Sequence, residues 1–230
     1  MSAGAEWPQR WVRERLGYAP LDTGLFAAAL THRSAGRRNN ERLEFLGDGV
    51  LNLLIAERLY RAFPDSDEGD LSRLRARLVS SEPLAEIASE LGLGEVLQLG
   101  SGELKSGGFR RRSILADAFE AVCGALYLDG GLEAARRLIE AVFAARIEAL
   151  PAPESLKDAK TRLQEYLQSR GLALPHYALE RTEGEAHAQT FWVSCAVPAL
   201  ELSASGSGSS RRRAEQQAAA AVLAQIESRI

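Results

Sequence analysis

The hydrophobic pattern of this chain of 230 residues changes period at residues 151–155, where two prolines lie within three positions. Two prolines so close together between helical patterns are typical of a linker. Before this segment apolar residues recur at helical spacing, whereas after it a short helix precedes alternating segments that indicate strands. The pattern therefore predicts an all-α domain at 8–150, a linker at 151–157, and a small α+β domain with the order α-β-β-β-α at 158–228.

Local signals place the helices of the first region. We expect Asp70 to cap a helix over 71–78, Pro83 to lie in the first turn of the next helix, and further helices at 113–127 and 132–150. The helix around residue 50 has an apolar face at helical spacing, which predicts the core positions Leu43, Leu46, Val50, Leu53 and Leu54.

The second region combines two helices with three strands. The expected helices cover 158–169 and 214–226, the strands cover 177–179, 191–197 and 200–202, and the serine- and glycine-rich residues 203–210 are expected to form a loop. The second strand directs one face inward, formed by Phe191, Val193, Cys195 and Val197. The last helix is expected to bury Ala214, Ala218, Ala221 and Val222.

Composition restricts the class of protein. The chain is 46% hydrophobic and 26% charged, which is ordinary for a soluble globular protein. It has no apolar run long enough for a membrane span and no signal-peptide pattern at its start. Its two cysteines, Cys123 and Cys195, offer no disulfide framework, so we expect a cytoplasmic protein without membrane contacts. The net charge of −3 argues against a protein that coats nucleic acid by bulk charge.

Two acidic groups point to a metal site. Glu41, Glu44 and Asp48 fall near about 0°, 300° and 340° on a helical wheel and form one ridge without lysine or arginine. Asp117 and Glu120 are spaced i, i+3 among apolar neighbours, where unpaired carboxylates are unfavourable. For either group alone, surface acids are the simpler interpretation; together they favour hard divalent cations. Two ions about 4 Å apart would suit phosphodiester hydrolysis.

Other chemistries lack their motifs. The chain has only three histidines, His32, His176 and His187, which excludes a di-iron bundle that needs two Glu-x-x-His motifs and disfavours histidine-ligated zinc. It contains no G-x-S-x-G, Walker or G-x-G-x-x-G motif, so we expect no nucleotide cofactor. The further acids at 65–70 are interpreted as a helix-capping turn, with the role of Glu68 left open.

The second region also has residues suited to RNA. Arg211, Arg212 and Arg213 open a helix, where the dipole already disfavours cations, so this arrangement favours a bound phosphate over a solvated turn. Thr161, Gln164 and Glu165 lie on one side of the earlier helix and can bond the 2′-hydroxyl groups of an RNA minor groove.

Several segments together resemble bacterial ribonuclease III: THRS, ERLEFLGDGVL, FPDSDEGDLSRLRARLV and GELKSGGFRRRSILADAFEA. The resemblance implies a cytoplasmic homodimer with two centres in one cleft. It implies magnesium, with manganese expected to substitute, and cleavage of double-stranded RNA to 5′-phosphate and 3′-hydroxyl ends with short 3′ overhangs. Ribosomal RNA precursors and other structured RNA, including messenger RNA, are the implied substrates. The implied residues are metal ligands Glu44, Asp117 and Glu120, catalytic Asp48 and Glu120, supporting Glu41 and Glu68, and the dimer contact Phe45.

The segments DAKTRLQEYLQ, GEAH and GSGSSRRRAEQQAAA resemble a double-stranded RNA-binding domain. By this resemblance, minor grooves are contacted by Thr161, Gln164, Glu165 and His187, and phosphates by Ser210, Arg211 and Arg212. Backbone contacts in the first domain are expected from Lys105, Arg110 and Arg111. Two alternatives stay open: a non-catalytic protein that masks structured RNA, disfavoured by the intact carboxylate set, and a DNA nuclease, disfavoured by the predicted contacts to 2′-hydroxyl groups.

Overall fold

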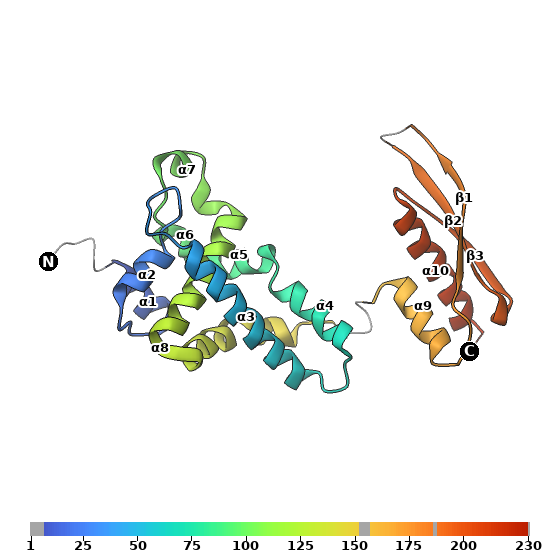
Figure 1. Ribbon diagram of the computed structural model, residues 1–230, viewed down its shortest axis with the longest axis horizontal. Helices are drawn as coiled ribbons and strands as arrows, with labels where there is room; N and C mark the ends of the chain where they lie inside the picture. The colour runs from blue at the N-terminus through green and yellow to red at the C-terminus, as the bar shows by residue number, and fades with distance from the viewer. Residues whose placement is uncertain (1–6, 152–156, 186–187, 230) are drawn as a thin grey trace. The chain divides into compact units, whose positions relative to one another are not determined.

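The computed structural model describes residues 7–151, 157–185 and 188–229, and the chain divides into two units, Met1–Pro151 and Ala152–Ile230 (Figure 1). Most of the linker expected at 151–157 lies outside the described residues. None of the helices in the described segments has the length and apolar character needed to cross a membrane.

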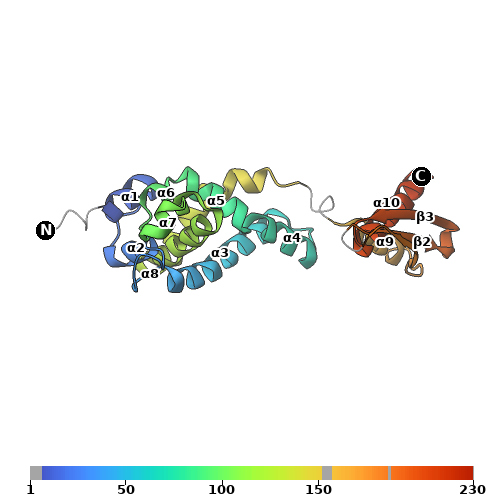
Figure 2. The same ribbon diagram turned by 90° about the horizontal axis from the view of Figure 1, so that it is seen from above.

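The first unit is helical, as predicted. Apart from an isolated bridge between Thr31 and Gln98, its described residues are helical or irregular. In chain order, the α-helices are α1 (Trp7–Leu16), α2 (Thr23–Ala29), α3 (Glu41–Ala62), α4 (Glu68–Leu78), α5 (Ser81–Glu90), α6 (Leu93–Val96), α7 (Ser101–Lys105) and α8 (Arg112–Glu148). A 3₁₀ turn at Gly108–Arg110 precedes α8, and Figure 2 shows α3 and α8 from above.

Helices α3 and α8 touch through their backbones. A Cβ atom added to Gly47 would lie 1.7 Å from the carbonyl oxygen of Glu120, and one added to Gly124 would lie 2.3 Å from the carbonyl oxygen of Leu43. Only glycine permits so close an approach at either position. The two acidic helices are therefore packed directly against each other, and this packing brings their carboxylates together.

The break within α8 lies at Gly131, which has φ 72° and ψ −175°. Glycine adopts this backbone conformation readily, and other residues adopt it rarely. The break separates the two helices predicted at 113–127 and 132–150. Just before it, the Asp129 carboxylate accepts hydrogen bonds from the Tyr18 hydroxyl at 2.8 Å and from the Asp22 backbone N–H at 2.6 Å.

Two details of the first unit differ from the sequence predictions. The N-cap of α4 is Asp67, whose side chain accepts from the Asp70 backbone N–H at 2.7 Å, and Asp70 itself is buried beside Arg73. Leu53, expected in the core, is 56% exposed. The buried face of α3 is rotated toward Gly47 and Leu51, because α8 packs against that side. Leu53 therefore faces away from the core.

The second unit has the predicted order α-β-β-β-α. It consists of α9 (Ala159–Gln168), β1 (His176–Glu183), β2 (Thr190–Val197), β3 (Leu202–Gly208) and α10 (Arg211–Glu227). The strands form an antiparallel sheet in the order β1-β2-β3, and both helices lie on one of its faces (Figure 1). The core between sheet and helices includes Leu163, Leu167, Cys195, Val197, Ala218 and Val222. Of the other predicted core positions, Val193 and Ala214 are buried, whereas Phe191 and Ala221 are half-buried.

The third strand was misplaced by the sequence prediction. Residues Pro198–Leu200 form a 3₁₀ turn and Glu201 has φ 54°, so the strand begins only at Leu202. It then continues through the segment expected to be a loop. A Cβ atom at Gly206 would lie 2.3 Å from the Ala218 backbone nitrogen. The serine- and glycine-rich composition therefore serves close packing of β3 against α10 and does not mark a loop.

Candidate metal centre and nucleic-acid interface

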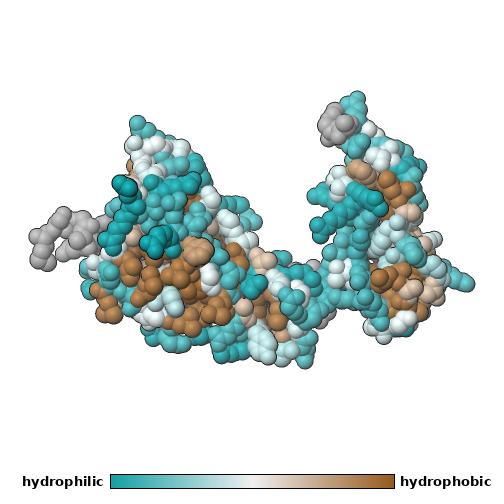
Figure 3. Space-filling model, viewed as in Figure 1, coloured by the Kyte–Doolittle hydropathy of each residue, from teal (hydrophilic) through white to brown (hydrophobic). Residues whose placement is uncertain are grey.

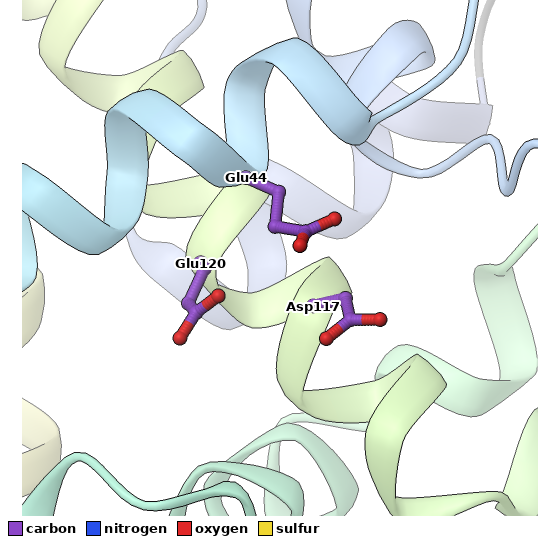
Figure 4. Close-up of side chains that lie close together, drawn as sticks. All are labelled: Glu44, Asp117 and Glu120. Atoms are coloured by element: carbon purple, nitrogen blue, oxygen red, sulfur yellow. The ribbon is translucent and has the colours of Figure 1, made fainter.

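Three carboxylates converge where α3 meets α8. Glu44 comes from α3, and Asp117 and Glu120 come from successive turns of α8 (Figure 4). Each side chain offers one oxygen atom, and these oxygen atoms all lie within 4.8 Å of one another. All three side chains are half-buried. The structure thus joins the two acidic groups that the sequence presents separately.

Burial and mutual repulsion disfavour ionisation of this cluster. Burial raises the pKa of Glu120 to about 8, with further contributions from the charges of Asp48, Asp117 and Glu44. Burial also raises the pKa of Glu44, and Asp117 and Glu41 add to the effect. The pKa of Asp117 is raised by burial, although the charges of His32 and Arg33 oppose this shift. The positive charges of His32 and Arg33 only partly offset the cost of ionising these carboxylates.

This donor set fits a hard divalent cation. Magnesium prefers oxygen ligands and usually combines one or two carboxylates with water and phosphate oxygens. Glu44 and Asp117 also line a polar pocket of about 310 Å³ that is open to solvent, so water and a substrate oxygen have access to them. A cation here would offset the negative charges of Asp48, Asp117 and Glu44, which add to the effect of burial on the pKa of Glu120.

The other predicted acids take different positions around the cluster. Asp48 is exposed, and its Oδ1 accepts a hydrogen bond from Asn52 at 2.7 Å. Glu41 is exposed and lies 3.6 Å from Arg33. Glu68 lies in the first turn of α4, where its carboxylate accepts a hydrogen bond from the Ser72 hydroxyl at 2.9 Å. Asp48 and Glu41 thus border the cluster, whereas Glu68 is held within its own helix.

The pocket also contains residues that the chemical reasoning from sequence did not assign. These are His32 and Arg33, from the segment after α2, and Glu103, which lies beside the predicted RNA contact Arg111. The THRS segment that contains His32 and Arg33 contributed only to the family resemblance. The position of His32 and Arg33 beside α3 and α8 depends on the tertiary fold, because His32 and Asp117 are 85 positions apart in the sequence.

Phe45 is 83% exposed and does not line the polar pocket. It borders an open apolar groove of about 1000 Å³. Hydrophobic residues gather over this part of α3 and the neighbouring segments (Figure 3). The apolar lining of the groove includes Leu25, Ala28, Leu43, Leu46 and Leu128.

The predicted RNA-contacting residues of α9 are accessible. Gln164 is exposed, and Thr161 is half-buried at the first turn, where Asp158 caps the helix. Glu165 is half-buried and pairs with Lys157 at 2.9 Å. His187, the fourth predicted minor-groove residue, lies outside the described residues.

The start of α10 presents the predicted phosphate-binding residues. Ser210 is the N-cap, and its side chain accepts a hydrogen bond from the Arg213 backbone N–H at 3.3 Å. Arg211 is exposed and its Nε lies 3.1 Å from the Glu215 carboxylate. Arg212 is exposed as well. The arginines therefore extend from a capped helix start whose dipole favours an anion.

The basic residues expected in the first unit lie around α7. Lys105 is exposed at the end of α7, and Arg110 is exposed with its guanidinium 5.1 Å from the centroid of the Phe109 ring. Arg111 instead forms an ion pair with Glu103 at 3.0 Å at the border of the polar pocket. Lys105 and Arg110 are thus available to a polyanion, whereas Arg111 is already engaged.

Comparisons with known proteins identify both units. A family model described as "Ribonuclease-III-like" matches residues 22–147, and one described as "Double-stranded RNA binding motif" matches residues 159–226. The chain is 58% identical over 212 residues to "Ribonuclease 3" of Nitrosococcus oceani, covering 91% of each protein. It is 56% identical to that of Pseudomonas fluorescens strain SBW25, covering 92% of this chain and 93% of the relative.

Solved structures agree with this similarity. A crystal structure of the nuclease domain of ribonuclease III from Campylobacter jejuni matches with a TM-score of 0.58 and 40% identity, covering 62% of this chain and 97% of that chain. A second structure of that domain, reported for its structural flexibility in a region involved in dimer formation, matches with a TM-score of 0.56 and 45% identity. It covers 58% of this chain and 97% of that chain. The chain therefore belongs to the ribonuclease III family, whose members are divalent-metal-dependent endoribonucleases that act on double-stranded RNA.

Proposed function

We propose that Glu44, Asp117 and Glu120 bind magnesium and that Asp48 and Glu120 are catalytic. The observation that carries this proposal is the convergence of three carboxylate oxygens, all within 4.8 Å of one another, from two helices. Manganese, which also accepts carboxylate and water oxygens, is expected to substitute. When bound, the divalent ions would supply an activated water and stabilise negative charge on the leaving oxygen.

The residues of the chain complete the site around these ligands. The Asp48 carboxylate accepts a hydrogen bond from Asn52 on the same helix, and its charge adds to the raised pKa of Glu120. We assign Asp48 as an acceptor for a proton of the attacking water. Glu41, which adds negative charge beside Glu44, is a supporting acid, and so is Glu68. The expected products carry 5′-phosphate and 3′-hydroxyl ends with short 3′ overhangs.

The second unit and the α7 region would hold the RNA duplex. Thr161, Gln164, Glu165 and His187 are assigned to minor grooves, where 2′-hydroxyl groups distinguish RNA from DNA. Phosphate contacts are assigned to Ser210, Arg211 and Arg212, and further backbone contacts to Lys105, Arg110 and Arg111. The exposure of Gln164, Arg211 and Arg212 supports these assignments. We place the domains at 8–150 and 158–228, and infer a cytoplasmic role in processing ribosomal RNA precursors and other structured transcripts.

Phe45 is proposed as a contact of a homodimer with two centres in one cleft. A phenylalanine that is 83% exposed beside an apolar groove is an unusual surface feature, and a second copy of the same face could bury it. The Campylobacter jejuni nuclease domain, 45% identical, has a region involved in dimer formation, which supports this assignment.

The catalytic assignment is tested by separating cleavage from binding. We expect Asp48→Asn and Glu120→Gln to slow cleavage of a labelled RNA duplex in magnesium at least about 100-fold, while affinity for the duplex is retained. Glu86→Gln, which removes an exposed carboxylate from α5, is the matched control. Mapping the ends of the wild-type products on the same substrate tests the product assignment. Cleavage at wild-type rates by both site variants would refute the assigned roles.

A further inference from the structure

In the second unit, one carboxylate joins the starts of the two helices proposed to contact RNA. Glu215 Oε2 on α10 lies 2.6 Å from Lys160 Nζ on α9, and Glu215 Oε1 lies 3.1 Å from Arg211 Nε. The Glu215 side chain is only 14% exposed. Lys160 Nζ also lies 4.5 Å from the centroid of the Tyr177 ring. Lys160, Glu215 and Arg211 are called the Glu215 bridge below.

Neighbouring contacts hold the bridge in place. The Lys160 backbone N–H donates to Gln216 Oε1 at 3.1 Å, which is a second link between α9 and α10. Asp158 caps α9 and also forms a side-chain hydrogen bond with Gln216. These contacts hold the Glu215 carboxylate in place. They therefore also restrict the position of Arg211, which donates a hydrogen bond to it.

The way in which Arg211 is held affects what it can bind. Glu215 contacts Nε, whereas the two terminal nitrogens of the guanidinium carry four further N–H donors. The Arg211 side chain is 60% exposed, so these donors reach solvent. Arginine often binds a phosphate through two parallel N–H donors. The bridge therefore restricts the motion of Arg211 while it leaves the donors for a phosphate accessible.

Glu215 places a negative charge at the proposed phosphate-binding site. Its hydrogen bond from Lys160 holds the pKa of the carboxyl below its usual range, so it is ionised at neutral pH. An ionised carboxylate at a phosphate-binding helix start repels the phosphates of RNA. Its presence there therefore needs an explanation. Lys160 offsets this charge, and the bridge as a whole keeps a net positive charge.

We propose that Glu215 is a positioning residue for double-stranded RNA, which holds the Arg211 guanidinium, through the link to Lys160 on α9, in the orientation that receives a phosphate. The inference rests on the proposed contact between Arg211 and phosphate. It gives an acidic residue a favourable effect on binding to a polyanion. A carboxylate that is merely nearby would have the opposite effect, so the sign of the effect decides between the two roles.

The test measures binding of the full chain in EDTA, where a divalent-metal-dependent nuclease does not cleave. The probe is a fluorescently labelled RNA duplex longer than the ~16 base pairs that such a module spans. Glu215→Gln should weaken binding about two- to tenfold, which corresponds to the entropy of ordering one long side chain. Glu227→Gln is the matched control, since it removes the same charge at the far end of α10, where Glu227 pairs with Arg162 at 3.1 Å. Its affinity should be unchanged or slightly higher.

A double-mutant cycle shows whether Glu215 acts through Arg211. Arg211→Gln alone should weaken binding and reduce the slope of log affinity against log salt by about 1, as expected for one lost phosphate contact. In that background, Glu215→Gln should have no further effect, because the side chain that it positions is absent. Melting curves by circular dichroism establish that each variant remains folded.

Each outcome decides one assignment. Unchanged or tighter binding by Glu215→Gln, or a loss that persists in the Arg211→Gln background, overturns the positioning role. Unchanged affinity and salt slope for Arg211→Gln alone overturns the phosphate contact on which the inference rests. If Glu215→Gln unfolds the second unit, Lys160→Met replaces it, because methionine keeps an unbranched apolar stem beside Tyr177. It should weaken binding only when Arg211 is present, and wild-type affinity would overturn the inference.

Discussion

The backbone of α3 at Gly47 lies so close to Glu120 on α8 that an added Cβ atom would be 1.7 Å from the Glu120 carbonyl oxygen. Glu44 lies three residues before Gly47 on the same helix. The missing side chain therefore determines how closely the carboxylates of Glu44 and Glu120 approach each other. The geometry of the proposed metal site therefore depends on a residue without a side-chain functional group.

Gly47→Ala should separate α3 from α8 and reduce both stability and cleavage. A methyl group cannot be accommodated against a backbone oxygen, so we expect a loss of at least about 2 kcal/mol in the free energy of unfolding. Urea unfolding and cleavage of duplex RNA are the measurements. The control is Gly49→Ala on the same helix, where an added Cβ meets nothing within 4 Å. It should stabilise the protein by about 0.5–1 kcal/mol. Equal stability of the two variants would contradict the close-packing argument.

Glu120→Gln should stabilise the metal-free protein as pH rises. The pKa of Glu120 is about 8 in the folded chain, above its unfolded value of 4.5, so the folded state binds this proton more tightly. Its contribution to stability is present at low pH and is lost between about pH 4.5 and 8. After allowance for partial solvent exposure, the variant should gain about 1–2 kcal/mol over wild type at the upper end. Unfolding in EDTA at several pH values measures this gain.

Magnesium should reverse this order. A cation that binds only the folded site stabilises it by mass action. Wild type should therefore gain thermal stability on addition of magnesium, whereas Glu120→Gln should gain little. A pH-independent difference in EDTA, or equal stabilisation of both proteins by magnesium, would contradict the assignment of Glu120 as a ligand.

Phe45→Glu should produce a monomer. The exposed ring lies beside an apolar groove, and a carboxylate placed there would oppose burial by a second copy. Sedimentation velocity of the full chain measures the change in mass. Leu174→Glu, which alters an exposed apolar side chain in the second unit, should remain dimeric. A Phe45→Glu variant that still sediments as a dimer would remove Phe45 from the interface.

Asp129→Asn should detach the segment after α1 from α8. The Asp129 carboxylate accepts hydrogen bonds from the Tyr18 hydroxyl and the Leu21 and Asp22 backbone N–H groups, at 2.6 to 2.8 Å. Asparagine keeps only one acceptor oxygen, and its NH2 group cannot accept the remaining N–H or O–H donors. We therefore expect a loss of about 1–3 kcal/mol. Thermal unfolding measures it, with Glu133→Gln, an exposed position on the same helix, as control. A change within experimental error would show that these bonds contribute little.

Periodicity and turn signals predicted most of the fold because they report local preferences. The helix from residue 41, the proline in the first turn of α5, and the alternation of β2 each depend on neighbours in sequence. The prediction was wrong where a distant element decides the outcome. Leu53 is exposed because α8 lies on another side of α3, and Gly206 lies in a strand because α10 packs against its bare backbone.

The amino-acid sequence alone predicts the division into two regions, the acidic residues on two helices, and the arginines at a helix start. These are properties of residue type and spacing along one element. The packing of the folded chain brings Glu44, Asp117 and Glu120 together. It also places His32 and Arg33 beside them and links Arg211 to Lys160 through Glu215. Local sequence patterns do not report these relationships, because they join segments distant in sequence. Their distances follow from how closely two backbones pack, and the glycines at 47 and 124 permit that approach between α3 and α8.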